Sequence, residues 1–129
     1  MSEKLTVEII SPDRLIIKTN AIEVNLPSYE GEIGILKDHI PLITFLRPGI
    51  IKIIDEKEKN FFVEEGTVEF SNNKLLVLTS TASELSTLNK NLVGSLIKEA
   101  EKKINSNEIT DKERYILTYK IDTLKSISK

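Results

Sequence analysis

The residues of this chain whose types could do chemistry lie close together, around its single histidine. Asp38 precedes His39, and Glu30 and Glu32 flank a glycine shortly upstream. An imidazole beside a carboxylate suits a zinc ligand or a general base, and paired carboxylates suit acid–base catalysis. One imidazole and one carboxylate are too few for a typical zinc site, however, and the two glutamates fall in a glycine-interrupted, solvent-facing loop. We therefore expect no catalytic residue and no metal site.

Two further patterns could bind a phosphate or a base, but each fits a structural role better. Gly31 and Gly34 lack the Gly-Lys-Ser/Thr ending and the following helix of a phosphate loop, so we interpret them as positions of positive φ. Tyr115 and Tyr119 are four residues apart, which predicts one face of a helix. Such a pair could stack a base, yet it is more typical of packing at a helix–sheet seam. We expect no cofactor.

The composition excludes several classes of partner. The 129-residue chain has a net charge of −2 from 18 basic and 20 acidic residues, so it has no global field that would attract nucleic acid or an anionic membrane. It contains no cysteine, which excludes disulfides and thiolate metal sites. No apolar stretch approaches the roughly 20 residues of a spanning helix, and the first residues do not resemble a signal peptide. We expect no nucleic-acid partner and no direct membrane insertion.

The elements that position these residues fall into two parts, and the first has the period of β-strands. Apolar and polar residues alternate in short runs, separated by turn-forming pairs at 48–49 and 72–73. This pattern predicts an antiparallel β-sandwich, or flattened barrel, over residues 1–84. We expect the strand at 76–78 to be buried on both faces. We also expect one apolar segment to belong to the core, namely Leu42, Ile43, Phe45 and Leu46.

Residues 85–129 change to the period of a helix. Apolar residues recur at every fourth position and predict one stripe, made by Leu88, Leu92, Leu96 and Ala100. This helix should end at 105–107, and a second should begin at Thr110, where Thr-Asp-Lys-Glu has the form of a capping box. The short linker predicts an antiparallel two-helix hairpin. The fold class is therefore mainly β plus α, and helices this short must take their stability from packing.

Four segments resemble one family, in the correct order. Residues 31–42 read Gly-Glu-Ile-Gly-Ile-Leu-Lys-Asp-His-Ile-Pro-Leu, which is similar to the signature of the epsilon subunit of rotary F-type ATP synthases. Residues 47–53, 62–70 and 76–82 resemble later segments of that family. The resemblance implies a ten-stranded β-sandwich followed by two helices. It also implies a non-catalytic central-stalk subunit that couples the gamma subunit to the c-ring, so that proton flow drives ATP synthesis.

The resemblance further implies an interface and a location. The positions that match the family's contacts with the c-ring loops and gamma would share one surface, made by Glu30, Gly31, Glu32, His39, Ile40 and Pro41. The protein would lie peripherally on the cytoplasmic face of a bacterial inner membrane, held there by its partners.

The hairpin departs from the family pattern. In some members it extends toward the alpha and beta subunits and hinders ATP hydrolysis, and a segment of the form Ile/Leu-Asp-x-x-Arg-Ala binds ATP. Here residues 88–93 read Leu-Asn-Lys-Asn-Leu-Val, so the arginine fork is missing and we expect weak or absent ATP binding. The altered positions are Leu88, Asn89, Asn91 and Leu92, with Arg114 on the second helix. The alternative to a stalk subunit is a stand-alone β-sandwich that binds a ligand or senses a nucleotide.

Overall fold

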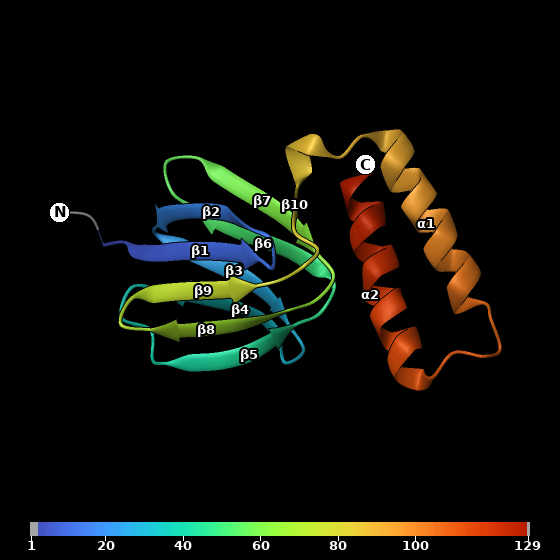
Figure 1. Ribbon diagram of the computed structural model, residues 1–129, viewed down its shortest axis with the longest axis horizontal. Coiled ribbons are helices and arrows are strands. Elements are labelled where there is room, and N and C mark those ends of the chain that lie inside the picture. Colours follow the sequence, from blue (N-terminus) through green and yellow to red (C-terminus); the bar gives the residue numbers. More distant parts are fainter. Residues whose placement is uncertain (1–2, 129) are drawn as a thin grey trace.

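A computed structural model describes residues 3–128 as a curled β-sheet followed by two helices (Figure 1). The predicted fold class, mainly β plus a helical hairpin, is confirmed. The strands are β1 (Leu5–Ser11), β2 (Arg14–Ala21), β3 (Glu23–Ser28), β4 (Gly31–Leu36), β5 (Leu42–Leu46), β6 (Gly49–Ile54), β7 (Glu58–Val63), β8 (Gly66–Ser71), β9 (Lys74–Leu78) and β10 (Ser83–Glu84). A 3-10 turn, η1 (Leu85–Thr87), leads to the helices α1 (Lys90–Ile104) and α2 (Asp111–Ile127).

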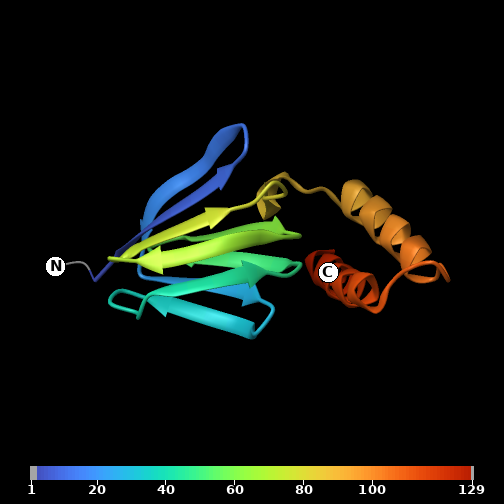
Figure 2. The same ribbon diagram turned by 60° about the horizontal axis from the view of Figure 1, so that its bottom comes forward.

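The core lies inside the curl of the sheet (Figure 2). Alternate residues of each strand point inward and are excluded from solvent, as Leu26 on β3, Ile51 on β6 and Phe70 on β8 are. Each buried aliphatic or aromatic side chain of this kind contributes about 1.5–3 kcal/mol of transfer free energy. The sandwich therefore has a continuous apolar core of its own, which fixes the positions of its turns.

The order of the strands corrects one expectation. The sheet runs β10-β7-β6-β3-β5-β8-β9-β1-β2, and β4 pairs with β3. We expected antiparallel pairing throughout, but β1 runs parallel to β9, from Thr6 opposite Lys74 to Ile10 opposite Leu78. Alternation identifies strands without identifying their partners, and a parallel pair needs a long crossover, which the strands between β1 and β9 supply.

Two expectations about burial were also wrong. Ile43 is 74% exposed and Phe45 is 58% exposed, whereas Thr44 between them is buried. Leu78 is exposed on β9, so that strand is not buried on both faces. The period of two sends alternate side chains to opposite faces, and within residues 3–128 no other element covers the outer face of β5, β8 and β9.

The predicted end of the first helix and the predicted start of the second are confirmed, whereas Leu88, expected in the stripe of the first helix, precedes α1. Asn89 caps α1, because its side chain accepts a hydrogen bond from the Leu92 amide at 2.8 Å. The capping box at Thr110 is complete: its hydroxyl accepts from the Glu113 amide, and the Glu113 carboxylate accepts from the Thr110 amide. Leu92 departs from the predicted stripe and is exposed, because Val93 and Ala100 are the buried residues of α1. No helix within residues 3–128 is both long and apolar enough to cross a membrane.

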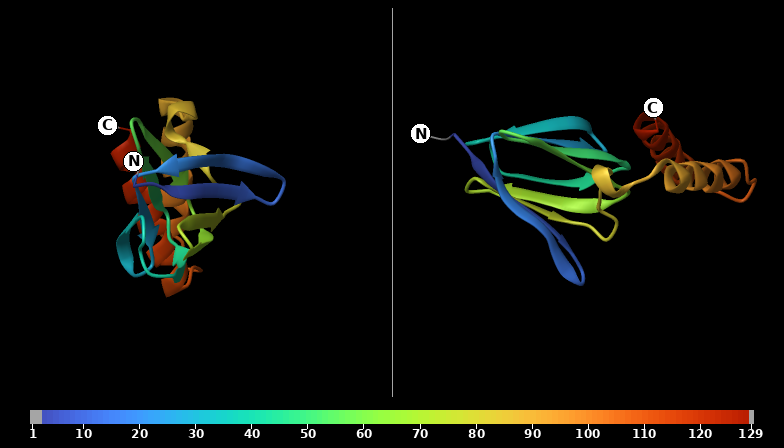
Figure 3. Two further views of the ribbon diagram at one scale, coloured as in Figure 1. Left: turned by 90° about the vertical axis from the view of Figure 1, so that its left-hand side faces the viewer. Right: turned by 90° about the horizontal axis from the view of Figure 1, so that it is seen from above.

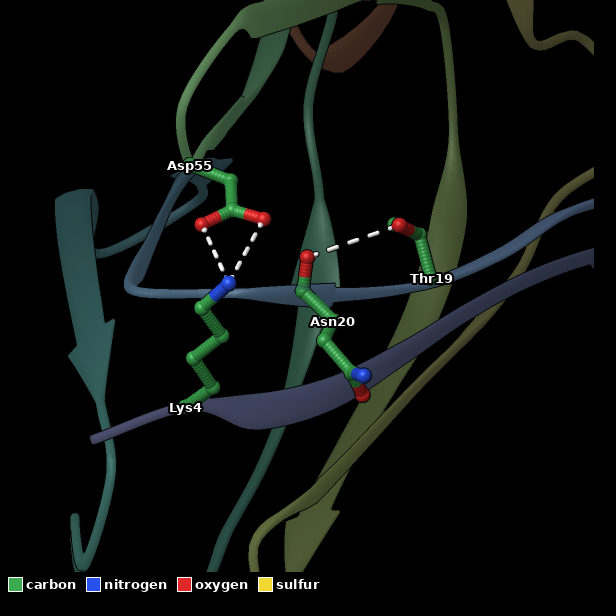
Figure 4. A network of polar contacts seen from close by, with 4 residues as sticks. All are labelled: Lys4, Thr19, Asn20 and Asp55. Carbon is green, nitrogen blue, oxygen red and sulfur yellow. Dashed lines mark hydrogen bonds and ion pairs between the residues drawn. The ribbon is translucent and has the colours of Figure 1, made fainter. Parts of the chain in front are cut away.

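The two ends of the sandwich differ. At one end, α2 lies next to the strands and α1 lies farther out (Figures 1 and 2). At the other end, Lys4 before β1 pairs with Asp55 after β6, with its ammonium 3.0 and 3.2 Å from the two carboxylate oxygens (Figure 4). The β1–β2 pair projects sideways from the rest of the sheet (Figure 3). The hairpin therefore adjoins only one set of turns.

Candidate functional site

The six candidate interface residues do not form one patch. Strand β4 separates them, since its first residue Gly31 pairs with Ser28 and its last residue Leu36 pairs with Glu23. A six-residue strand spans about 20 Å. Glu30, Gly31 and Glu32 therefore lie at the hairpin end of the sandwich, and His39, Ile40 and Pro41 lie at the opposite end (Figure 1). The expectation of a single shared surface was wrong, because the extended strand between the two groups places them far apart although they are close in the sequence.

One buried hydroxyl links the two sides of the turn between β3 and β4. Ser28 is fully buried, and its Oγ donates to the Gly31 carbonyl at 2.8 Å and accepts from the Glu30 amide at 3.1 Å. Gly31 has φ of 114°, which an L-residue rarely adopts. Gly34, in contrast, lies inside β4 without positive φ, so our interpretation holds for only one of the two glycines. The turn presents Glu30 and Glu32 to solvent.

The turn between β4 and β5 is held by side-chain hydrogen bonds. Asn73 accepts from the Asp38 amide at 2.6 Å and donates to the Asp38 carboxylate at 3.1 Å. His39 Nδ1 lies 2.7 Å from the Ile40 carbonyl, and its ring meets Phe70 edge-on with centroids 5.9 Å apart. These two contacts hold the imidazole ring in place at the turn. Among residues 3–128 no three acidic, histidine or cysteine side chains are grouped so as to hold a metal.

An exposed apolar row, which the sequence did not reveal, crosses the outer face of the sheet. Phe45 pairs with Thr67 and Thr67 with Leu78, and Leu78 in turn pairs with Ile10 and Ile10 with Leu15. We define the apolar row as Phe45, Leu78, Ile10 and Leu15. Its Phe45 and Leu15 are more than half exposed, at 58% and 54%. The exposed Thr67 interrupts the row between Phe45 and Leu78. Exposed apolar side chains gathered on one face are nevertheless typical of a protein–protein contact surface.

Alternation alone could not have placed this row. Each of its residues occurs in a run where neighbouring positions are also apolar, such as Ile9 and Ile10 on β1. No local signal identifies it, because the inward position of Thr44 on β5 is visible only in the folded structure. A threonine at an inward position forces the apolar residues on either side of it outward, and Thr44 is buried.

The altered segment at the start of the hairpin does not meet Arg114. Asn89 uses its side chain to cap α1, whereas Arg114 donates to the Ile104 carbonyl at 2.8 Å, where α1 ends. The 15 residues of α1 span about 22 Å, so the two groups lie at opposite ends of the hairpin. Leu88 is half-buried, and Asn91 and Leu92 are exposed. These five positions assemble no site for a phosphate.

The chain is similar to known proteins in both sequence and fold. Residues 4–85 match the family model described as ATP synthase, Delta/Epsilon chain, beta-sandwich domain. The chain is 44% identical to the ATP synthase epsilon chain of Pelagibacter ubique (strain HTCC1062) over 130 residues, which cover 99% of this chain and 100% of the relative. It is 33% identical to the ATP synthase epsilon chain of Parvibaculum lavamentivorans, covering 98% of this chain and 97% of the relative.

The fold likeness extends over both parts of the chain. A chain in the cryo-EM structure of the Euglena gracilis mitochondrial ATP synthase superposes with a TM-score of 0.80 at 19% identity, covering 98% of this chain and 82% of that chain. The sandwich and the hairpin thus recur together in the same arrangement.

Proposed function

The chain belongs to the ATP synthase delta/epsilon family, and from this premise we propose that it couples the gamma subunit to the ring of c subunits in the central stalk. It is a non-catalytic subunit: proton flow turns the ring and the stalk, and the rotation drives ATP synthesis in the partner subunits. It is a peripheral subunit of the stalk, and we place it on the cytoplasmic face of a bacterial inner membrane, where its partners hold it.

The observation that carries this proposal is the apolar row on a rigid sandwich. A subunit that transmits torque must present its contacts at fixed positions, and the row is built on four strands that share one buried core. We assign the gamma subunit to the apolar row, because a few exposed apolar anchors dominate the energy of such interfaces. Ile40 and Ile43, both 74% exposed, extend this apolar surface toward the far turn.

We assign the c-ring loops to the turn between β3 and β4. Glu30 and Glu32 give this turn a negative charge and are exposed, so they suit a polar or cationic loop. The Ser28 hydrogen bonds restrict the turn, which lowers the conformational entropy that is lost on binding. His39, Ile40 and Pro41 at the other end would then contact gamma and not the ring.

The test is assembly with the ATP synthase from which this subunit has been removed. The double variant F45S/L78S should bind about tenfold or more weakly, since each anchor is worth more than about 1 kcal/mol. The matched control K57S changes an exposed residue on the turn between β6 and β7, away from the row, and should assemble normally. Co-migration with the complex on sucrose gradients measures the difference. Failure of the unmodified chain to assemble would disprove the proposed function, and normal assembly of the double variant would disprove the assigned face.

We further propose that residues 1–84 anchor the subunit and residues 85–129 regulate ATP hydrolysis. ATP hydrolysis by the complex should be measured with the full chain and with a chain that ends at Ser86. If both bind and only the full chain slows hydrolysis, the hairpin inhibits; if neither slows it, the subunit only couples. Calorimetric titration of the full chain with ATP should show no micromolar binding, because Asn89 and Arg114 are engaged in caps at opposite ends of the hairpin.

A further inference from the structure

All three tyrosines of the chain meet at the seam between the sandwich and the hairpin. The rings of Tyr29 and Tyr115 stack with centroids 5.9 Å apart and an interplanar angle of 19°. Tyr115 also meets Tyr119 edge-on at 4.8 Å, and the Arg47 guanidinium lies 4.0 Å from the centroid of the Tyr119 ring. We call these four residues the tyrosine cluster. The predicted role of Tyr115 and Tyr119 in packing at a helix–sheet seam is confirmed.

Within residues 3–128, the hairpin contacts the sandwich through an apolar cluster near η1, through the tyrosine cluster, and through an ion pair between Lys120 of α2 and Glu64 after β7, with the ammonium 2.7 Å from the carboxylate. Near η1, Phe62 of β7 packs with Val93 and Leu124, which are buried. The tyrosine cluster forms the second attachment, nearer the start of α2. Tyr115 lies about 13 Å before Leu124 along the axis of α2. The tyrosine cluster is therefore separated from η1, where the chain enters the hairpin. Loss of the cluster would therefore leave the hairpin held near η1 and at the Lys120–Glu64 ion pair, with the start of α2 released from the sandwich.

The two sandwich residues of the cluster come from the segments that carry the candidate interface. Tyr29 belongs to the turn of Glu30 and Glu32, and its amide donates to the Phe45 carbonyl at 3.2 Å. The Arg47 amide donates to the Pro27 carbonyl at 3.0 Å. Backbone hydrogen bonds thus connect the turn that carries Tyr29 to the segment that carries both Phe45 and Arg47. Movement of Tyr29 must displace the turn on which it lies.

We propose that the tyrosine cluster couples docking of the hairpin to ordering of the turn at residues 29–32. The docked hairpin holds Tyr29 in the stack and so restricts the turn, and an ordered turn in return favours docking. Coupling of this kind is reciprocal by thermodynamic necessity. Its consequence in the assembled complex rests on the proposed function: a c-ring loop that binds the ordered turn would strengthen docking of the hairpin.

The experiment compares Y115A with L92A in the isolated full chain. Both substitutions truncate a partly exposed side chain of the hairpin (39% and 44% exposed), but only Tyr115 touches the cluster. Alanine favours helix at either site. Faster hydrogen exchange in Y115A would therefore result from lost contacts with the sandwich and not from a lower helix propensity. Hydrogen exchange should rise roughly two- to tenfold in peptides that cover α2 and in the peptide that covers residues 28–34. L92A should change neither, and Y115F should restore protection because the ring stack persists.

The chain supplies a second readout and a reciprocal test. It has no tryptophan, so its near-ultraviolet tyrosine circular dichroism reports the three rings of the cluster alone and should fall in Y115A. Y29A should raise exchange in α2, although the substitution lies in the sandwich. Peptides of β9 should keep their protection in every variant, which shows that the core is intact.

Two results would overturn the coupling. One is that Y115A exposes α2 while residues 28–34 keep their protection. The other is that Y29A leaves α2 unchanged. Both are measured without partner subunits, so the coupling can fail while assembly with the stalk succeeds. Conversely, a chain that fails to assemble would disprove the proposed function without affecting this result.

Discussion

The sandwich and the hairpin are stabilised in different ways. Sixteen buried side chains form one cluster inside the sandwich, whereas the cluster that fixes the hairpin has three, Phe62, Val93 and Leu124, and one of these belongs to the sandwich. The sandwich core is self-sufficient, and the hairpin depends on a seam. A part that must transmit torque needs the first kind of stability, and a part that regulates by moving needs the second.

The largest expected effect separates the two faces of the sandwich. F70A empties a fully buried position at the centre of the core and should lower the free energy of unfolding by about 3–5 kcal/mol. F45A makes the same substitution at an exposed position and should change it by less than about 0.5 kcal/mol. Urea unfolding followed by far-ultraviolet circular dichroism measures both. Equal losses in the two variants would show that the outer face is covered.

The same pair of phenylalanines shows what the sequence could predict. The strands, both helix caps and the helical hairpin follow from local rules: alternation, turn-forming pairs and a capping box act over a few residues. Alternation places Phe70 inward between Glu69 and Ser71, but it assigns no face to Phe45, which lies in a nearly continuous apolar run. Which face of a strand is covered depends on strand order, and the parallel pairing of β1 with β9 is a long-range contact that no local pattern encodes.

The candidate site was predictable to a similar degree. The glycine and histidine motif pointed to two real turns, and Ser28 and Asn73 do fix them. Their placement at opposite ends of β4 follows from the extended geometry of six intervening residues, which the motif does not state. The apolar row could not be predicted, because it exists only once five strands, β5, β8, β9, β1 and β2, are aligned in register. Likewise, the stack of Tyr29 on Tyr115 joins residues that are remote in the sequence.

Two glycines sharpen the comparison, because the same substitution should act in opposite directions. A Cβ on Gly49 would lie 2.8 Å from Pro27 Cγ and against the rest of that ring, so G49A should destabilise the sandwich by about 1–3 kcal/mol. A Cβ on Gly94 would meet nothing within 4 Å. G94A should therefore stabilise α1 by about 0.5–1 kcal/mol, since alanine restricts the unfolded chain and favours helix. Thermal unfolding should show a lower midpoint for G49A, and hydrogen exchange in α1 should be slower in G94A. If G94A were destabilised, α1 would have to pack against another segment at that position.

The cap at Asn89 separates a structural role from a nucleotide-binding one. N89A removes the acceptor of the Leu92 amide and should raise exchange in the first turn of α1, with a loss of about 1 kcal/mol. N89D keeps an acceptor and should retain the cap. It also restores the carboxylate of the family's ATP-binding pattern. If N89D bound ATP at micromolar concentration, the single amide would be the reason for the expected loss of binding, and the remote position of Arg114 would be irrelevant.

The smallest expected effect is a pH dependence confined to the seam. The interaction with the Tyr119 phenol, and next partial burial, raises the pKa of Tyr115 above its ordinary value of 10.0, while Arg47 opposes the shift. A pKa that is higher in the folded state favours the neutral phenol. The contribution of the neutral Tyr115 phenol to stability is therefore complete below pH 10.0 and is lost as the pH rises through the raised pKa.

This pH dependence can be read from the ionisation of the tyrosines themselves. In a spectrophotometric titration, the ionisation that Y115F removes should occur above pH 10.0, and protection of α2 against exchange should fall over the same range. Y119F removes the neighbouring phenol but keeps a ring beneath Arg47, so it should return the pKa of Tyr115 toward 10.0 without undocking the hairpin. Ionisation of Tyr115 at its ordinary pKa of 10.0 in the unmodified chain would mean that the seam is open in solution. The hairpin would then be docked by the Phe62 cluster and the Lys120–Glu64 ion pair, so it would depend on fewer contacts still, in contrast to the self-sufficient sandwich.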